Sequence, residues 1–130
     1  MERIDIKTSS RFEMVDITNE VRSAVKRSGK KEGICVLYVP HTTAALTVNE
    51  GADPSVKEDI LMELDRNIPL DDGYSHLEGN AAAHIKSALM GPSLTLIIEE
   101  GDIVLGTWQS IFFCEFDGPR SRKVFLKILG

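Results

Sequence analysis

The sequence has no long hydrophobic run and very few cysteines. No stretch approaches the ~20 apolar residues that a membrane-spanning helix needs. Residues 1–16 carry charges throughout and lack the apolar core of a signal peptide. Cys35 and Cys114 each lie in an apolar, strand-like run, so we expect buried, reduced thiols rather than a disulfide. These absences favour a cytoplasmic protein that needs no membrane.

An excess of positive charge is also missing. Lys and Arg number 15 against 20 Asp and Glu, which gives a formal net charge of −5. An acidic chain is a poor partner for nucleic acid or for an anionic membrane. The hydrophobic content of 42% and charged content of 27% are those of a globular protein. With 130 residues, the chain is long enough for one domain with its own core, spanning residues 1–130.

Hydrophobic periodicity and turn residues predict strands at both ends and helices between them. Alternation over 3–7 and 12–17 favours an opening hairpin. Helices are expected over 18–29 with Thr18 as the cap, from Asp53 to Pro69, and over 81–90 after Asn80. The other strands are expected at 33–39, 42–49, 94–99, 103–116 with a break at Gly106, and 123–129. This order predicts an α+β fold, a single domain built on an antiparallel β-sandwich with about three helices.

The only three histidines are His41, His76 and His84. We expect them at a break between strands, in a turn-rich loop and in the first turn of a helix. Neutral imidazoles bind zinc and related divalent metals, and three of them with one open position make a catalytic type of site. Glu50 and Glu78 would then serve as ligands or general bases. The alternative is three unrelated histidines, because the spacings match no short zinc motif.

Two further motifs carry candidate binding residues. Trp108 and Gln109 interrupt an apolar strand, where Trp108 could stack on a ring and Gln109 could bind the edge of that ring. The alternative is that Trp108 anchors the core or an interface and Gln109 faces solvent. A glycine-containing turn bears Arg120 and Arg122, whose guanidinium groups suit phosphate or carboxylate. An ordinary charged hairpin turn is the alternative there.

Taken together, these sequence motifs resemble those of the YjbQ-like family. The resemblance rests on His41-Thr-Thr-Ala-Ala-Leu-Thr-Val-Asn-Glu50, Asp72-Gly-Tyr-Ser-His76-Leu-Glu-Gly-Asn80-Ala-Ala-Ala-His84, Gly106-Thr-Trp-Gln109 and Glu115-Phe-Asp-Gly-Pro-Arg120. It covers essentially the whole chain, with the motifs in the same order and at the same spacings.

The resemblance implies a β-sandwich subunit that assembles as a homotrimer. It also implies a divalent metal held by His41, His76 and His84, zinc-like by its ligands, although Mg²⁺ is possible. The implied activity is that of a secondary thiamine-phosphate synthase, which joins a pyrimidine pyrophosphate to a thiazole phosphate and releases pyrophosphate. By position, the catalytic candidates are Glu50, Glu78 and Arg120, and the candidates for substrate binding are Asn80, Trp108, Gln109 and Arg120.

Two other functions are compatible with the same residues. A metal-dependent hydrolase would use a metal-bound hydroxide with Glu50 or Glu78 as base. A non-catalytic trimer would only bind a small anion in the same pocket. The hydrolase would act on a phosphoester or an amide, whereas the other two hypotheses involve a small phosphorylated or anionic ligand.

Overall fold

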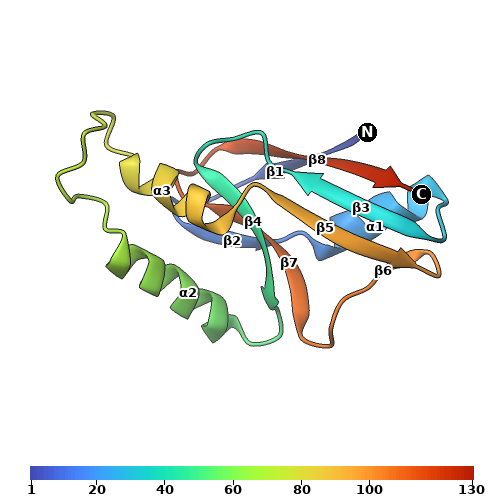
Figure 1. The fold of residues 1–130 in the computed structure, drawn as a ribbon. Coiled ribbons are helices and arrows are strands. Elements are labelled where there is room, and N and C mark those ends of the chain that lie inside the picture. The colour runs from blue at the N-terminus through green and yellow to red at the C-terminus, as the bar shows by residue number, and fades with distance from the viewer.

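The computed structural model describes all residues from Met1 to Gly130, and its strands form two antiparallel sheets (Figure 1). The larger sheet has the order β1-β8-β3-β5-β6 and the smaller sheet the order β2-β7-β4. The strands of the larger sheet are β1 (Glu2–Lys7), β3 (Gly33–Tyr38), β5 (Ser93–Glu99), β6 (Asp102–Ile103) and β8 (Ser121–Leu129). Those of the smaller sheet are β2 (Glu13–Asp16), β4 (Ala44–Glu50) and β7 (Gln109–Glu115).

Three helices complete the fold. They are α1 (Thr18–Ser28), α2 (Pro54–Asn67) and α3 (Ala81–Met90). The buried face of α1 joins the main core of 18 residues, which fills the space between the two sheets. A second cluster of six buried residues lies on the other face of the smaller sheet, where the apolar residues of α2 pack against it. The expected α+β sandwich with three helices is therefore confirmed.

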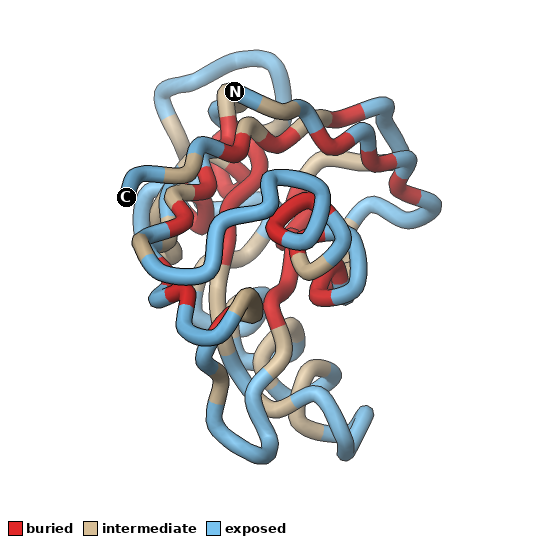
Figure 2. Tube along the Cα trace, turned by 90° about the vertical axis from the view of Figure 1, so that its right-hand side faces the viewer, coloured by how far each residue is buried: buried red, intermediate tan, exposed pale blue.

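Burial differs sharply between the helices. α2 has no buried residue, whereas α3 begins with three buried alanines, Ala81 to Ala83. Figure 2 shows that the buried parts of the chain gather inside the molecule and that the exposed parts form its outer loops. α2 is thus an outer layer, and α3 is fixed against β4. Because α3 is anchored in this way, its first turn can hold side chains at a defined place beside the strands.

The structure corrects two local predictions. β1 and β2 are strands as expected, but they do not form a hairpin, since β1 pairs with β8 and β2 pairs with β7. Alternation identifies a strand but not its partner, and the segment between these two crosses from one sheet to the other. Thr18 begins α1 without capping it, because its hydroxyl accepts the N–H of Ile111 and donates to Asp16 instead.

Most other local predictions are confirmed, and the break expected at Gly106 separates β6 from β7, but Asn80 does not cap α3. Asp53 caps α2 by accepting the N–H of Ser55, and α3 covers the expected residues. Cys35 and Cys114 are free and buried, and burial raises their thiol pKa values to about 11 and about 12. None of the three helices is long and apolar enough to cross a membrane.

Candidate functional site

A polar pocket of about 380 Å³ lies where the segment before β4, the start of α3 and the turn between β7 and β8 meet. Its size is that of a small-molecule site, but its lining contains no hydrophobic residue. The lining residues are Pro40, His41, Thr42, Thr43, Glu78, Asn80, His84, Asp117, Arg120 and Arg122. We call this site the polar pocket. A hollow of about 440 Å³ beside the N-terminus contains none of the predicted site residues.

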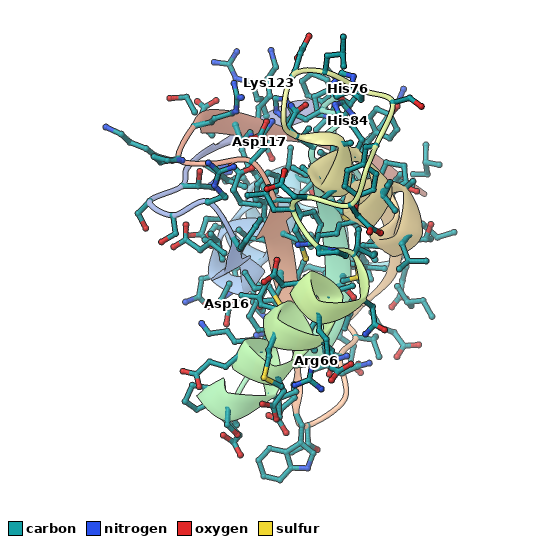
Figure 3. All side chains as sticks on the ribbon, turned by 90° about the vertical axis from the view of Figure 1, so that its left-hand side faces the viewer. Asp16, Arg66, His76, His84, Asp117 and Lys123 are labelled. Atoms are coloured by element: carbon teal, nitrogen blue, oxygen red, sulfur yellow. The ribbon has the colours of Figure 1, made fainter.

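The structure brings most of the predicted residues to this place. His41, Glu78, Asn80, His84 and Arg120 all line the polar pocket. His76 lies just beside it, with its ring centroid 5.2 Å from that of His84 and the two planes at 81°. Figure 3 shows these two histidines close together, at the end of the molecule where Asp117 and Lys123 also lie. Residues that are far apart in sequence therefore converge as the motifs implied.

Glu50, Trp108 and Gln109 are not part of this pocket. In the register of β4 and β7, Glu50 pairs with Gln109, whereas the pocket lies near the pair Ala44 and Glu115 at the opposite end. Six residues of extended strand separate these two ends by about 20 Å. Trp108 is 64% exposed in the turn before β7. Within one subunit, this second group of predicted residues is separate from the first.

Glu50 and Gln109 have local structural contacts at that far end. The Glu50 carboxylate accepts the N–H groups of Ala52 and Asp53, at the start of α2. The Gln109 side chain accepts the N–H of Gly106. Their proposed roles in catalysis and substrate binding stay predictions.

His41 is held by the backbone of β8. Its Nε2 accepts the N–H of Lys123 at 3.0 Å, so in this orientation the ring is neutral and its proton is on Nδ1. Burial, followed by the positive charges of Arg122 and Lys123, lowers the pKa of His41 below its ordinary value. His41 therefore offers the pocket an N–H donor rather than a lone pair.

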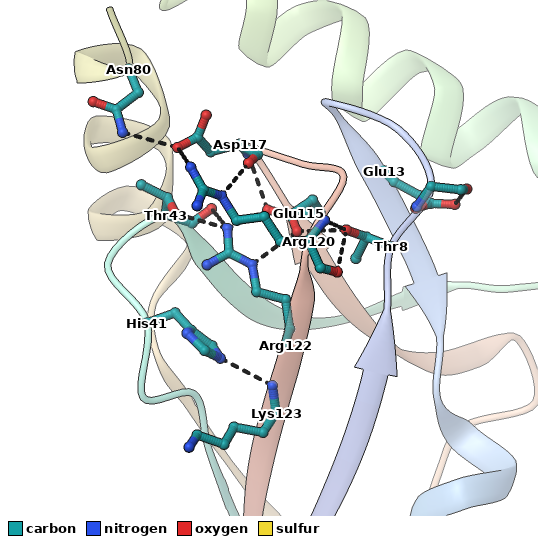
Figure 4. Close-up of polar contacts among 11 residues, drawn as sticks. Thr8, Glu13, His41, Thr43, Asn80, Glu115, Asp117, Arg120, Arg122 and Lys123 are labelled. Atoms are coloured by element: carbon teal, nitrogen blue, oxygen red, sulfur yellow. Dashed lines mark hydrogen bonds and ion pairs between the residues drawn. The ribbon is translucent and has the colours of Figure 1, made fainter. Parts of the chain in front are cut away.

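A chain of polar contacts connects His76 to Arg120 through Asn80 and Asp117. Asn80 donates from Nδ2 to Asp117 Oδ2 at 2.9 Å, which leaves its Oδ1 to accept from His76 Nε2 at 2.8 Å. Asn80 precedes α3 as predicted, but its side chain makes no capping bond. Asp117 also receives two bonds from Arg120, at 2.7 Å to its carbonyl and 3.0 Å to its carboxylate. This chain of contacts orients the exposed guanidinium of Arg120 at the pocket (Figure 4).

Beneath Arg120 lies a buried ion pair between Arg122 and Glu115. Arg122 donates from Nε and Nη2 to the two carboxylate oxygens, and Nη2 also donates to the hydroxyl of Thr43 at 2.8 Å. Glu115 further accepts from the Thr8 hydroxyl at 2.8 Å and from the backbone N–H of Asp117 at 3.1 Å. Burial alone would raise the pKa of Glu115, but these hydrogen bonds hold it below its ordinary value.

From the sequence, Arg122 is a candidate together with Arg120 for binding phosphate or carboxylate, whereas Glu115 has no role. A signal was available, however. Arg122 occupies the same inward series of β8 as the buried Val124 and Leu126. A charged residue in an inward series needs a buried partner, and Glu115 at the end of the apolar β7 is of opposite charge.

The arrangement does not fit a three-histidine metal centre as it stands. No group of three or more His, Cys, Asp or Glu side chains is placed to hold a metal ion. A ligating imidazole gives a lone pair to the metal and its other N–H to an acceptor. His41 is reversed in this respect, because its partner Lys123 N–H is a donor. Metal binding by His41, His76 and His84 stays a prediction.

Comparison with known proteins places the chain in a widely distributed group. A family model described as "UPF0047 protein YjbQ-like" matches residues 2–130. The chain is 56% identical to UPF0047 protein MJ1081 of Methanocaldococcus jannaschii over 128 residues, covering 98% of this chain and 93% of that protein. It is 47% identical to UPF0047 protein YugU of Bacillus subtilis over 131 residues, covering 100% and 99%.

Solved structures agree. A crystal structure of an uncharacterized YjbQ/UPF0047 protein from Clostridium acetobutylicum is 53% identical, with a TM-score of 0.97, covering 99% of this chain and 100% of that one. A protein of unknown function from Sulfolobus solfataricus is 39% identical with a TM-score of 0.95, covering 99% and 95%. These similarities extend over the whole polar pocket and its supporting strands.

Proposed function

Because the chain belongs to the YjbQ-like UPF0047 family, we propose that its polar pocket is the active site of a transferase of the secondary thiamine-phosphate synthase type. The substrates would be a pyrimidine pyrophosphate and a thiazole phosphate. The carbon–oxygen bond to pyrophosphate breaks, the leaving group keeps the electron pair, and the thiazole nitrogen forms the new bond to carbon.

The observation that carries this proposal is the composition of the pocket. Apart from Pro40 its lining is polar or charged, with two arginines, two histidines and an asparagine beside the carboxylates of Glu78 and Asp117, so it suits a phosphorylated ligand better than a hydrophobic one. Arg120 is exposed and oriented by Asp117, so its charge can stabilise the departing pyrophosphate. The synthase step transfers no proton, so Glu78, at the same pocket, would act as a base in the hydrolase alternative.

A stacking surface for the substrate rings is not present in the pocket of a single subunit. Trp108 could supply one only from another copy, which agrees with the proposed homotrimer. The larger sheet also has an apolar outer face, where Ile34 pairs with both Ile97 and Leu129 and all three are 41–57% exposed. Exposed apolar groups in contact with one another favour association with a second copy.

The activity is tested by incubating the purified protein with both precursors and measuring thiamine phosphate and pyrophosphate. Parallel samples are stripped of metal, or loaded with Zn²⁺ or Mg²⁺. We expect product from the wild type and a loss of at least tenfold in Arg120→Gln. The control is Arg3→Gln, an exposed arginine on β1 that lies outside the polar pocket. Absence of product in every metal condition would reject the synthase.

The same experiment separates the two alternatives. Phosphate release from the pyrimidine pyrophosphate alone would identify a hydrolase. Thermal stabilisation by phosphate without any turnover would identify a binding protein.

The homotrimer is tested by the solution mass of wild type and of Ile97→Lys, with Glu58→Lys on α2 as the control. We expect three chains per particle for the wild type and the control, and dissociation of Ile97→Lys.

A further inference from the structure

The guanidinium of Arg122 is only partly used by the protein. Its side chain is 5% exposed, and its Nε and Nη2 make all of its hydrogen bonds. The third nitrogen, Nη1, has no partner in the chain, and no dashed line reaches it in Figure 4. Ser87 Oγ is the only enclosed side-chain nitrogen or oxygen without a partner, so Nη1 is open to solvent. Since Arg122 lines the polar pocket, that solvent is in the pocket.

This free nitrogen is held at a fixed place. The two carboxylate oxygens of Glu115 accept hydrogen bonds from Nε and Nη2 of the guanidinium, and the hydroxyl of Thr43 accepts a third bond from Nη2. A planar fork that is fixed on one side presents its remaining N–H groups in a defined direction. A buried arginine whose free donors face a polar pocket is arranged to receive an acceptor from a ligand.

His41 supplies a second donor at the same pocket. Lys123 N–H occupies Nε2, so the proton of the neutral ring is on Nδ1. The two nitrogens of an imidazole ring point away from each other, so Nδ1–H is directed away from the backbone of β8. Lys123 fixes the tautomer because a backbone N–H can only donate, which excludes the other neutral form.

Negative groups that face the pocket are mostly paired. Glu115 is bound to Arg122, and the carboxylate of Asp117 receives bonds from Asn80 and Arg120. Glu78 is exposed and lies in the loop before α3. Near Arg122 and His41, the pocket therefore offers hydrogen-bond donors, and no unpaired carboxylate there would repel an anion.

We propose that Arg122 Nη1 and His41 Nδ1–H together form an anion subsite that binds one phosphate group, free or as an ester. The subsite accepts oxygens through donors whose directions are set before the ligand arrives. This inference deepens the proposed function, since it assigns the position of one phosphate group within the proposed active site. Glu115, Thr43 and the Lys123 N–H are positioning groups that hold the two donors.

Two substitutions of His41 separate its donor from its structural role. In His41→Gln the side-chain oxygen can replace Nε2 as the acceptor for Lys123, but no donor remains at the Nδ1 position. In His41→Asn the side-chain nitrogen can replace Nδ1–H, but the acceptor for Lys123 is lost. We expect phosphate to bind at least tenfold more weakly to His41→Gln, and within about threefold of wild type to His41→Asn.

Arg122→Lys tests the other donor. Lysine keeps a positive charge for Glu115 but has no second nitrogen for the pocket. We expect inorganic phosphate and pyrophosphate, measured by calorimetry, to bind at least tenfold more weakly, while circular dichroism shows a folded protein. In the wild type, phosphate should shift the NMR signals of Arg122 Nη1 and His41 Nδ1, which a purely structural pair would leave unchanged.

The outcomes distinguish this proposal from the synthase. Phosphate binding that is unaffected by His41→Gln and Arg122→Lys, or absent in the wild type, overturns the subsite, whatever the synthase assay gives. Conversely, phosphate binding that depends on both residues supports the subsite even where no thiamine phosphate is formed. The same shift produced by chloride at equal concentration would also overturn it, because the donors would then not select phosphate.

Discussion

The fold buries two cations in different ways, Arg122 on β8 beside the polar pocket and Lys86 on α3. Arg122 has a carboxylate, a hydroxyl and a carbonyl as hydrogen-bond partners, and its counter-ion Glu115 is fully buried. Lys86 is 1% exposed, and its Nζ lies 4.1 Å from the ring centroid of Phe12 and 3.5 Å from Asp65. Asp65 is half-exposed, on α2.

The difference lies in what each counter-ion would lose. Glu115 is fully buried, so water cannot solvate its carboxylate if Arg122 is removed. Asp65 is half-exposed and remains hydrated if Lys86 is removed. Aromatic faces also tolerate a neutral neighbour, while a buried carboxylate does not. The fold therefore needs the positive charge of Arg122, whereas Lys86 mainly fills space between the helices and the smaller sheet. Four measurements test this contrast.

The largest effect is expected from Arg122→Met. It leaves Glu115 buried without a counter-ion, since only the neutral donors Thr8 and Asp117 N–H remain, which should lower the free energy of unfolding by about 3–5 kcal/mol. The double variant Arg122→Met, Glu115→Leu should recover most of that loss, because both charges are gone. Urea denaturation of wild type and of both variants measures this. A double variant no more stable than the single one would contradict the argument.

The next effect concerns acid. Since the pKa of Glu115 is lowered from 4.5, its contribution to stability is complete above pH 4.5 and is lost as the pH falls through the folded value. The wild type should therefore lose stability in this range relative to the Arg122→Met, Glu115→Leu variant. Urea midpoints of both proteins across the acid range give the difference. Parallel curves would show that Glu115 titrates normally.

Lys86→Met should change stability by less than about 1 kcal/mol. Methionine fills a similar volume, makes favourable contacts with aromatic rings, and leaves Asp65 in water. Urea denaturation alongside Lys30→Met, a change at an exposed lysine, provides the reference. A loss as large as that of Arg122→Met would mean that the two cations are held alike.

The smallest effect is expected in alkali. Burial lowers the pKa of Lys86 from 10.5, and Asp65 offsets this only in part. Between the lowered value and pH 10.5 the unfolded chain binds more protons, so this term stabilises the fold as the pH rises. The buried thiols act in the opposite sense, but they are common to wild type and Lys86→Met. The difference between the two proteins should therefore favour the wild type increasingly up to pH 10.5.

Local features of the fold were predictable from sequence, whereas strand partners were not. Asp53 with Pro54, and Gly91 with Pro92, mark helix ends through chemistry within a few residues. The partner of β1 is β8, more than a hundred residues away, and no local signal identifies it. The hairpin prediction failed for this reason.

The same distinction between local and non-local information applies to the candidate site. The motifs identified His41, Asn80, His84 and Arg120, which do meet in one pocket. Their mutual geometry depends on non-local contacts, such as the bond from Lys123 to His41, so the tautomer could not be foreseen. The register of β4 and β7 then separates Glu50 from the histidines, although the sequence places Glu50 only nine residues after His41.

The position of β8 has a consequence for how the chain is made. This last strand lies between β1 and β3 in the larger sheet, and it carries both Arg122 and the N–H that holds His41. Synthesis from the N-terminus therefore exposes two unpaired strand edges until residues 121–129 arrive. Neither the sheet nor the pocket can be completed in advance, so an interrupted chain would be prone to aggregation and would also lack the subsite.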